Sequence, residues 1–438
     1  MDFTNKIFFS ISGKYFLYGV NILYSIILIN YLGIDLYAIY SVIFIIPLLV
    51  VSIGSLGIGQ SIIYHVKRNT NRQNGIMLWM CVLFWAILSF VYCSVLFLSA
   101  DFIFEYLNKG DITVEYDAMI LSWLIIPVLI LRKYLISFLR GYYKINQVVI
   151  IESMVQPVLK VVFIAIIYIY DLGLYYIILT LIVVELIAII LTVIQLNREV
   201  AICMNVGKEA ANFKRVMAFA LKSHTGTIFQ KLNVDLVMLL SMPLITSEEI
   251  AFIMLSLKFL NIVNLPIGGL INVLVPKISR SDFKKIVIVG SMSVRVSILI
   301  VLAALPFLWI FSEYVITLLY GDTFIGIGDT IKILFFGVGF LYITNIMLVM
   351  LTYFGKPKYK IYARFTGLML SLSTLYSLHF VEYTHISEYS IVAGYLMALL
   401  LSIYFVNRHL DINFRDFLII KYSDIIFIYA LLRRKLSN

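Results

Sequence analysis

Long apolar stretches separated by short polar connections make up most of this chain of 438 residues. A helix needs about 20 mostly apolar residues to cross the hydrocarbon core of a bilayer. Hydropathy and helix breakers predict twelve such spans, at about residues 13–33, 39–63, 76–99, 118–140, 148–170, 174–196, 215–242, 250–275, 286–311, 329–354, 361–380 and 388–406. The pattern therefore predicts an all-α fold, a polytopic membrane protein.

The connections between these spans alternate in charge. Basic residues gather at every second connection, as in the groups Lys67–Arg68 and Lys356–Arg364, whereas the opposite connections are acidic and hold Lys109 as their one basic residue. Basic loops stay on the cytoplasmic side of a membrane. We therefore expect both termini in the cytoplasm, with residues 407–438 forming a tail that contains an interfacial helix.

The two halves of the chain resemble each other, which indicates an internal repeat. Lys14 corresponds to Lys222 at an offset of 208 residues, and Gly110-Asp111 corresponds to Gly321-Asp322 at an offset of about 212. Six spans per half is an even number, so both halves enter the membrane in the same orientation. We expect two pseudo-symmetric six-helix lobes, at residues 1–197 and 215–406, joined by a cytoplasmic linker at residues 198–214.

Composition narrows the class of protein further. Apolar residues make up 62% of the chain and charged residues 13%, which is outside the range of soluble globular proteins. The net charge of +10 is spread over short loops, so topology explains it better than a nucleic-acid partner does. The three Cys and five His lack the spacing of metal ligands, and we expect no metal, no cofactor and no catalytic residue.

Charges inside the seventh and eighth spans are the main candidates for a functional site. A Lys or Asp at the centre of a membrane helix costs roughly 2.5–3.5 kcal/mol, so such residues usually face a bundle interior or a hydrated cavity. Lys231 and Asp235 are spaced i, i+4 and are expected to pair. Lys258, at nearly the same depth, would then remain to bind an anion; its alternative role is a second structural partner of Asp235.

Further basic residues lie near the ends of spans or opposite an acid. Lys14 and Lys222 lie near cytoplasmic ends, where they either line the mouth of a cavity or extend to the headgroups. Arg295 has the same two interpretations, and a structural ion pair is a third. Lys160 and Glu185 lie at equal depth in the fifth and sixth spans, which favours a neutral interhelical pair. Substrate binding is thus assigned to Lys258, Lys222, Lys14, Lys231 and Arg295, and ion coupling or structural pairing to Asp235, Lys160 and Glu185.

Several short motifs, in this order and spacing, resemble a known family. They are YLGIDLYAIYSVIF from Tyr31, LGIGQSIIYHVKR from Leu56, SFLRGYYKINQ from Ser137 and LLYGDTF from Leu318. Over residues 1–406 the chain resembles the polysaccharide-biosynthesis (O-antigen, Wzx-type) flippases of the multidrug/oligosaccharidyl-lipid/polysaccharide exporter superfamily. The resemblance implies a MATE-like fold, and Lys14, Lys222 and Lys258 are the residues that match the family's basic positions.

The resemblance also implies a function. The expected protein is a transporter of the bacterial inner membrane and not an enzyme. It would flip an oligosaccharide repeat unit on undecaprenyl pyrophosphate by alternating access of the lobes around a cationic cavity. The lipid bilayer and the polymerase and chain-length regulator of the same pathway are the expected partners. The alternatives are a lipid II-type flippase, a multidrug exporter of the same superfamily, whose binding lobe would be acidic, and a membrane sugar polymerase, which needs a large periplasmic loop.

Overall fold

The computed structural model describes residues 3–109, 113–200, 210–263, 283–381 and 383–410, and every regular element in these ranges is a helix. The chain is an all-α, polytopic membrane protein. The repeat landmark Gly110-Asp111, the end of the predicted eighth span and the predicted tail helix lie outside the described residues.

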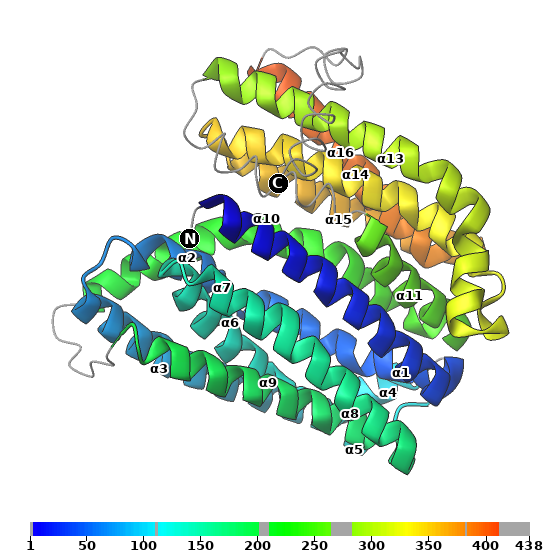
Figure 1. Ribbon diagram of the computed structural model, residues 1–438. Coiled ribbons are helices and arrows are strands. Elements are labelled where there is room, and N and C mark those ends of the chain that lie inside the picture. The colour runs from blue at the N-terminus through cyan, green and yellow to red at the C-terminus, as the bar shows by residue number, and fades with distance from the viewer. Residues whose placement is uncertain (1–2, 110–112, 201–209, 264–282, 382, 411–438) are drawn as a thin grey trace. The chain divides into compact units, whose positions relative to one another are not determined.

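Within each described range the helices follow one another through short turns (Figure 1). Those of the first half are α1 (Phe3–Gly54), α2 (Ile58–Val66), α3 (Asn71–Leu98), α4 (Ala100–Leu107), α5 (Tyr116–Trp123), α6 (Ile125–Gly141), α7 (Ile145–Val149), a π-helical turn (Ile150–Val155), α8 (Gln156–Tyr170) and α9 (Leu174–Leu196). Those of the second half are α10 (Ala210–Ser241), α11 (Ser247–Val263), α13 (Phe283–Tyr320), α14 (Ile327–Tyr353), α15 (Lys358–His379) and α16 (Ile386–Leu410), with short 3₁₀ turns at Met242–Leu244 and Asp322–Phe324.

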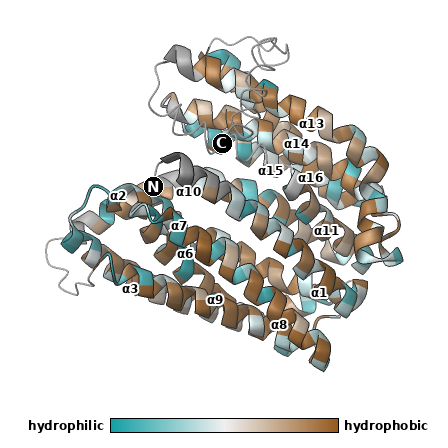
Figure 2. Ribbon diagram, viewed as in Figure 1, coloured by the Kyte–Doolittle hydropathy of each residue, from teal (hydrophilic) through white to brown (hydrophobic). Residues whose placement is uncertain are grey.

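Within the described residues, every predicted span coincides with a helix or with consecutive helices. Eight segments of the described chain are long and apolar enough to cross a membrane, and one of these, Ser12–Gly54, contains the first predicted span and most of the second. The three remaining predicted spans correspond to α10, α11 and α15. Figure 2 shows the same division by colour, with apolar residues dominating α8 and α9 and polar residues gathered near the turn that joins α2 to α3.

A single glycine separates the first two spans. Gly33 has φ 70° and ψ −179°, a conformation that is essentially restricted to glycine, and it interrupts α1. The hydropathy pattern predicts a polar connection at residues 34–38. The structure instead joins the two spans through one residue, because a glycine in this conformation breaks the helix without a loop.

The fifth predicted span is continuous but contains a wider turn. The residues Ile150–Val155 form a π-helical turn directly before Gln156 and Pro157, at the start of α8. Proline has no backbone N–H and disturbs the hydrogen bonds of the preceding turn. A π-helical turn accommodates this disturbance without ending the helix.

Helix positions confirm the internal repeat. Four helices of the second half begin 211 to 213 residues after their counterparts in the first half, and α10 begins 207 residues after α1. The pairs of starts are Asn71 and Phe283, Tyr116 and Ile327, Ile145 and Lys358, and Leu174 and Ile386. The chain therefore consists of two six-helix sets with the same order of elements, as the sequence predicts.

The described residues form two compact units. Unit 1 is Met1–Lys231 with Met238–Ala251, and unit 2 is Leu232–Val237 with Phe252–Asn438. In unit 1, α9 packs against α6 and α8, and α1 packs against α8; in unit 2, α14, α15 and α16 pack on one another. The boundary between these units falls between residues 231 and 252, whereas the repeat predicts a linker between the lobes at residues 198–214.

Most of α10 belongs to unit 1 because polar contacts hold it there. The hydroxyl of Ser61 donates to the carbonyl oxygen of Val216 at 2.7 Å. At the other end of the helix, the hydroxyl of Tyr106 donates to the carbonyl oxygen of Leu239 at 3.2 Å. Buried backbone carbonyl groups seldom lack a hydrogen-bond donor, so these contacts fix α10 to α2 and α4.

Candidate functional site: a basic cluster inside unit 1

Three basic side chains come together within unit 1. Lys133 on α6 lies within electrostatic range of Lys231 on α10, and His224 on α10 lies within range of both lysines. Lys133 is half-buried, and Lys231 is exposed and so open to a ligand. His224 is buried, and its Nε2 donates to the carbonyl oxygen of Ser52 at 2.9 Å. We call Lys133, His224 and Lys231 the basic cluster.

Helix geometry and one glycine position the cluster. His224 and Lys231 are seven residues apart, which is nearly two helical turns, so they lie on the same face of α10. A Cβ atom on Gly57 would lie 2.6 Å from Cβ of His224 and 2.8 Å from the carbonyl oxygen of Ala220. Gly57, which also has φ +69°, therefore lets α10 approach closely enough to bring His224 to Ser52.

An ion pair lies next to the cluster. Nε of Arg132 on α6 is 2.8 Å from Oε2 of Glu185 on α9, and these side chains are 17% and 6% exposed. Gln156 on α8 completes the group: it accepts from Arg132 at 2.6 Å and donates to Glu185 at 2.8 Å. We call Arg132, Gln156 and Glu185 the ionic triad.

The ionic triad adds to one prediction. Equal depth indicated Lys160 as the partner of Glu185, and the structure shows that Arg132 and Gln156 hold this carboxylate, while the pairing with Lys160 stays a prediction. Lys160 is half-buried on α8, four residues after Gln156 and therefore on the same side of that helix. Depth alone could not show which helices supply these partners, because α6, α8 and α9 each have a polar side chain at this level.

The formal charges of the cluster and the triad do not cancel. Arg132, Lys133 and Lys231 carry three positive charges, and Glu185 carries one negative charge, so the balance is +2 before any charge on His224. Such a surplus inside membrane-spanning helices favours a negatively charged ligand.

The other predicted residues of unit 1 lie elsewhere. Lys14 is half-buried on α1, within electrostatic range of Arg140, which is paired with Glu152. Lys222 lies on α10, two residues before His224, and its side chain falls outside the described part of the structure.

Unit 2 holds the remaining predicted residues. Lys258 is exposed on α11, Arg295 is 5% exposed within α13, and Asp235 is half-buried on α10 within electrostatic range of Tyr395. Lys231 therefore faces Lys133 and His224, whereas Asp235 lies near Tyr395. The i, i+4 pairing of Lys231 with Asp235 stays a prediction.

Three functional candidates were missed by the sequence analysis. Arg132 and Lys133 are adjacent basic residues deep in a predicted span, which is a signal that the sequence does contain. Arg364 was counted with a cytoplasmic connection, yet it lies on α15, is 3% exposed and donates to Oδ1 of Asn345 on α14. Nε and Nη1 of Arg364 are buried and have no hydrogen-bond partner among the described residues.

No group of His, Cys, Asp and Glu side chains within the described ranges is arranged to hold a metal ion. The architecture and the buried charges together define a multi-pass helical protein whose membrane-spanning helices contain a basic site. Membrane transporters commonly place their binding residues in this way.

No protein-family model matches the sequence, and no curated protein matches it either. Solved structures do share the fold. An inward-facing multidrug resistance MATE family transporter of the MOP superfamily gives a TM-score of 0.73, with 14% identity over 90% of this chain and 94% of that one.

Two further structures give the same result. A MOP superfamily transporter from Pyrococcus furiosus, described as having a binding pocket of reverse polarity, gives a TM-score of 0.69 at 13% identity, over 92% of this chain and 94% of that one. The MATE multidrug transporter DinF-BH, solved as a complex with a small molecule, also gives 0.69 at 13% identity, over 95% and 96% of the two chains. The chain therefore has the fold of the MATE transporters.

Proposed function

We propose that this protein flips oligosaccharide repeat units, carried on undecaprenyl pyrophosphate, across the bacterial inner membrane for the assembly of O-antigen or capsular polysaccharide. The observation that supports this proposal best is the basic cluster beside the ionic triad, with its formal balance of +2 inside membrane-spanning helices. A pyrophosphate is the part of such a substrate that this charge would attract.

The physical problem for such a substrate is its headgroup. Moving a diphosphate and several sugars through hydrocarbon costs on the order of tens of kcal/mol without compensation. Lys133 and Lys231 supply positive charge that lowers this cost, and Arg132, held by Glu185, keeps α6 and α9 in place beside them. Lys14, Lys222, Lys258 and Arg295 are proposed as further anion ligands along the route.

The proposed mechanism is alternating access of the two lobes. The polyprenyl tail stays in the bilayer while the headgroup passes through the protein, so no covalent bond is made or broken and the protein acts as a transporter, not an enzyme. An inside-negative membrane potential favours outward movement of a negative headgroup by about 2.3 kcal/mol per charge per 100 mV. The polymerase and chain-length regulator of the same pathway would then use the product.

Reconstitution tests this function directly. Purified protein is inserted into vesicles with undecaprenyl-pyrophosphate-linked N-acetylglucosamine that carries a fluorescent label, and the label's accessibility from outside is followed over time. We expect the wild-type protein to translocate the label. The double variant Lys133→Gln/Lys231→Gln should be at least about tenfold slower, because two charges that attract the pyrophosphate are gone.

The matched control is Lys109→Gln, the same substitution at an exposed lysine of a connection. It should translocate at the wild-type rate. Equal rates for the double variant and the control would remove the basic cluster from the transport route. Failure of well-folded wild-type protein to move the labelled lipid would contradict the proposed substrate.

A multidrug exporter of the same superfamily is the second candidate, and the similarity of fold to the multidrug transporter DinF-BH favours it. The same vesicles, loaded with a cationic rhodamine dye in place of the labelled lipid, distinguish the two functions. A basic cluster repels a cationic ligand, so we expect no protein-dependent movement of the dye. Dye export without movement of the lipid would establish the drug exporter, and a lipid II-type substrate is tested by exchanging the labelled glycan.

A further inference from the structure

Unit 1 contains a second polar feature, distant in sequence from Lys133 and the ionic triad. A partly enclosed cavity of about 210 Å³ lies between the turn that joins α2 to α3 and the first turns of α10. A single bound water needs roughly 10–15 Å³ by the same measure, so the cavity can accept a much larger group.

The lining divides into two chemical halves. Polar side chains form one half: His65, Asn69, Gln73 and Arg215. Apolar side chains form the other half: Ile76, Met77, Met80, Phe213 and Val216. A cavity of this kind suits a ligand that has a charged end and an apolar end.

Hydrogen bonds and ring contacts hold the walls in place. The hydroxyl of Ser61 donates to the carbonyl oxygen of Val216, and Nδ1 of His65 donates to the carbonyl oxygen of Ser61 at 2.9 Å. The rings of Tyr64 and Phe219 stack at 4.7 Å, which adds a second contact between α2 and α10. Since Nδ1 of His65 carries the proton of this bond, Nε2 is the ring nitrogen that remains for a ligand.

The turn between α2 and α3 is itself well ordered. The side chain of Thr70 accepts from the backbone N–H of Gln73 at 3.3 Å, and the side chain of Gln73 accepts from the backbone N–H of Thr70 at 3.0 Å. This capping box fixes the first turn of α3, which supplies part of the cavity wall. The cavity is therefore formed before any ligand binds.

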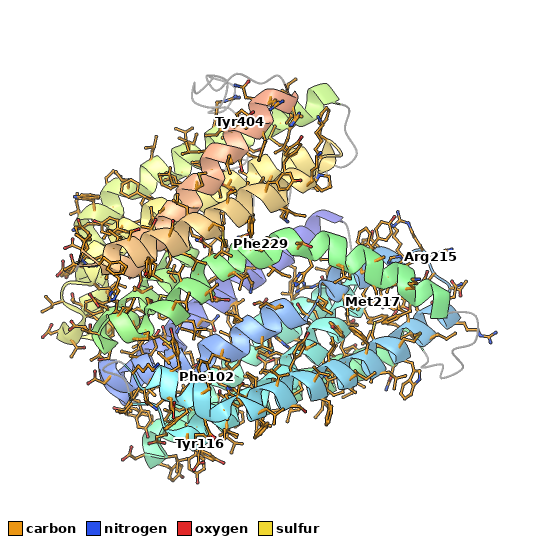
Figure 3. The ribbon with its side chains drawn as sticks, turned by 180° about the vertical axis from the view of Figure 1, so that it is seen from behind. Phe102, Tyr116, Arg215, Met217, Phe229 and Tyr404 are labelled. Atoms are coloured by element: carbon orange, nitrogen blue, oxygen red, sulfur yellow. The ribbon has the colours of Figure 1, made fainter. Side chains whose placement is uncertain are left out.

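The two segments that form the cavity carry charge of one sign. Lys67 and Arg68 on the turn, Arg72 at the start of α3, and Lys214 and Arg215 on α10 are exposed, and residues 61–80 and 210–231 contain no Asp or Glu. Figure 3 shows Arg215 close to the N-terminal end of α10. The positive-inside rule places these basic residues at the cytoplasmic headgroup level, where the leaflet is rich in anionic lipid.

We propose that this cavity binds an anionic phospholipid of the cytoplasmic leaflet. Arg215 contacts the phosphate, Nε2 of His65 accepts from a hydroxyl of the headgroup, Asn69 and Gln73 contact the glycerol and ester oxygens, and the first methylene groups pack on Met77, Met80 and Phe213. Basic pockets between membrane helices on the cytoplasmic side are suited to such headgroups. The apolar half distinguishes this site from one for a free phosphate ion. A bound lipid would hold the start of α10 against the turn between α2 and α3.

Binding to lipid nanodiscs or mixed micelles tests the proposal without any transport assay. The purified full chain is titrated with phosphatidylglycerol, with phosphatidylcholine and with inorganic phosphate, and the thermal midpoint is recorded. We expect phosphatidylglycerol to raise the midpoint by a few degrees, roughly 3–5 °C, and the other two to leave it unchanged.

Two variants locate the effect. Arg215→Gln should weaken the apparent affinity for phosphatidylglycerol roughly tenfold, because it removes a charged hydrogen-bond donor to the phosphate. Met80→Trp, which fills the apolar half without changing charge, should abolish the shift. Lys214→Gln is the matched control, an adjacent basic residue that does not line the cavity, and should keep the wild-type response.

Three outcomes would overturn the proposal. Equal losses in Arg215→Gln and Lys214→Gln would mean that general surface charge attracts the lipid. An equal shift with inorganic phosphate would mean that the ligand is a free anion. A full response in Met80→Trp would mean that the lipid binds elsewhere.

Discussion

Unit 1 and unit 2 share an order of helices but treat their buried polar groups differently. Unit 1 compensates the guanidinium of Arg132 with the carboxylate of Glu185 and the amide of Gln156. Unit 2 gives the guanidinium of Arg364 a single hydrogen-bond acceptor among the described residues, the amide of Asn345. The first arrangement is neutral as a pair, whereas the second retains its positive charge.

The repeat shows which residues of unit 2 occupy the positions of the ionic triad. At the offset of 212, the positions that match Arg132, Gln156 and Glu185 are Thr344, Leu368 and Met397. The ionic triad therefore has no charged counterpart in unit 2. In its place, Asn233 accepts from the hydroxyl of Ser371 and donates to the carbonyl oxygen of Ile391 at 3.2 Å. The two halves therefore share the order of their helices but differ in the buried polar side chains between them.

The largest effect is expected from breaking the ionic triad. Glu185→Leu leaves Arg132 buried without a carboxylate and should lower the free energy of unfolding by about 3–5 kcal/mol. Unfolding of purified protein in detergent measures this loss. Because an apolar pair of similar volume is tolerated, Arg132→Met together with Glu185→Leu should recover most of it. A double variant as unstable as the single one would contradict the pairing.

A smaller effect is expected from the neutral network of unit 2. Asn233→Leu removes the partner of the Ser371 hydroxyl and of the Ile391 carbonyl group, which should cost about 1–3 kcal/mol in the same unfolding assay. Ser373→Ala is the control, since that exposed hydroxyl bonds a carbonyl oxygen of its own helix. Equal losses in both variants would mean that Asn233 does not hold α10 to α15 and α16.

Arg364→Met tests whether the buried guanidinium of unit 2 lacks a compensating negative charge. Its one hydrogen bond to Asn345 offsets little of the cost of burying a guanidinium. The free energy of unfolding should therefore stay the same or rise, by about 1 kcal/mol. The unfolding assay should separate it clearly from Arg132→Met alone, which leaves Glu185 buried without its cation. A loss in Arg364→Met as large as in Arg132→Met would mean that a negative group holds Arg364, and the contrast between the units would disappear.

The smallest effect is expected at the pair of Arg140 and Glu152, whose side chains are 47% and 26% exposed. Exposed ion pairs contribute about 0–1 kcal/mol, so Arg140→Gln should lower the free energy of unfolding by less than about 1 kcal/mol. Repeating the measurement in high salt should reduce the difference further. A loss comparable to that of Glu185→Leu would show that burial is not what separates these pairs.

Hydropathy predicted the helices well because each span is a long apolar run with polar ends. The sixth span was predicted at residues 174–196 and is observed as Leu174–Leu196. The repeat was also predictable, since landmarks such as Gly321-Asp322 survive in both halves. The form of the connection at Gly33 was not, because the pattern predicted five connecting residues, 34–38, where the structure has a break at one glycine.

The site was predicted in part. Lys231 was singled out from its depth, but its neighbours Lys133 and His224 come from other turns and another helix, and only packing brings them together. Depth identified Glu185 but not Arg132 and Gln156, because counting residues along the chain cannot tell which of several neighbouring helices a side chain faces. Arg364 looked like a loop residue because three lysines precede it within eight residues, yet α15 begins at the second of these and carries Arg364 inward.

The π-helical turn at Ile150–Val155 holds one residue more than an α-helical path of the same rise. Removing one residue there would restore a regular helix and leave Gln156 and everything after it facing the same way. Sequences related to this chain by descent can therefore differ in length by one residue at this point. An alignment gap there would mark the insertion of one residue into a continuous helix, not the loss of a helical segment.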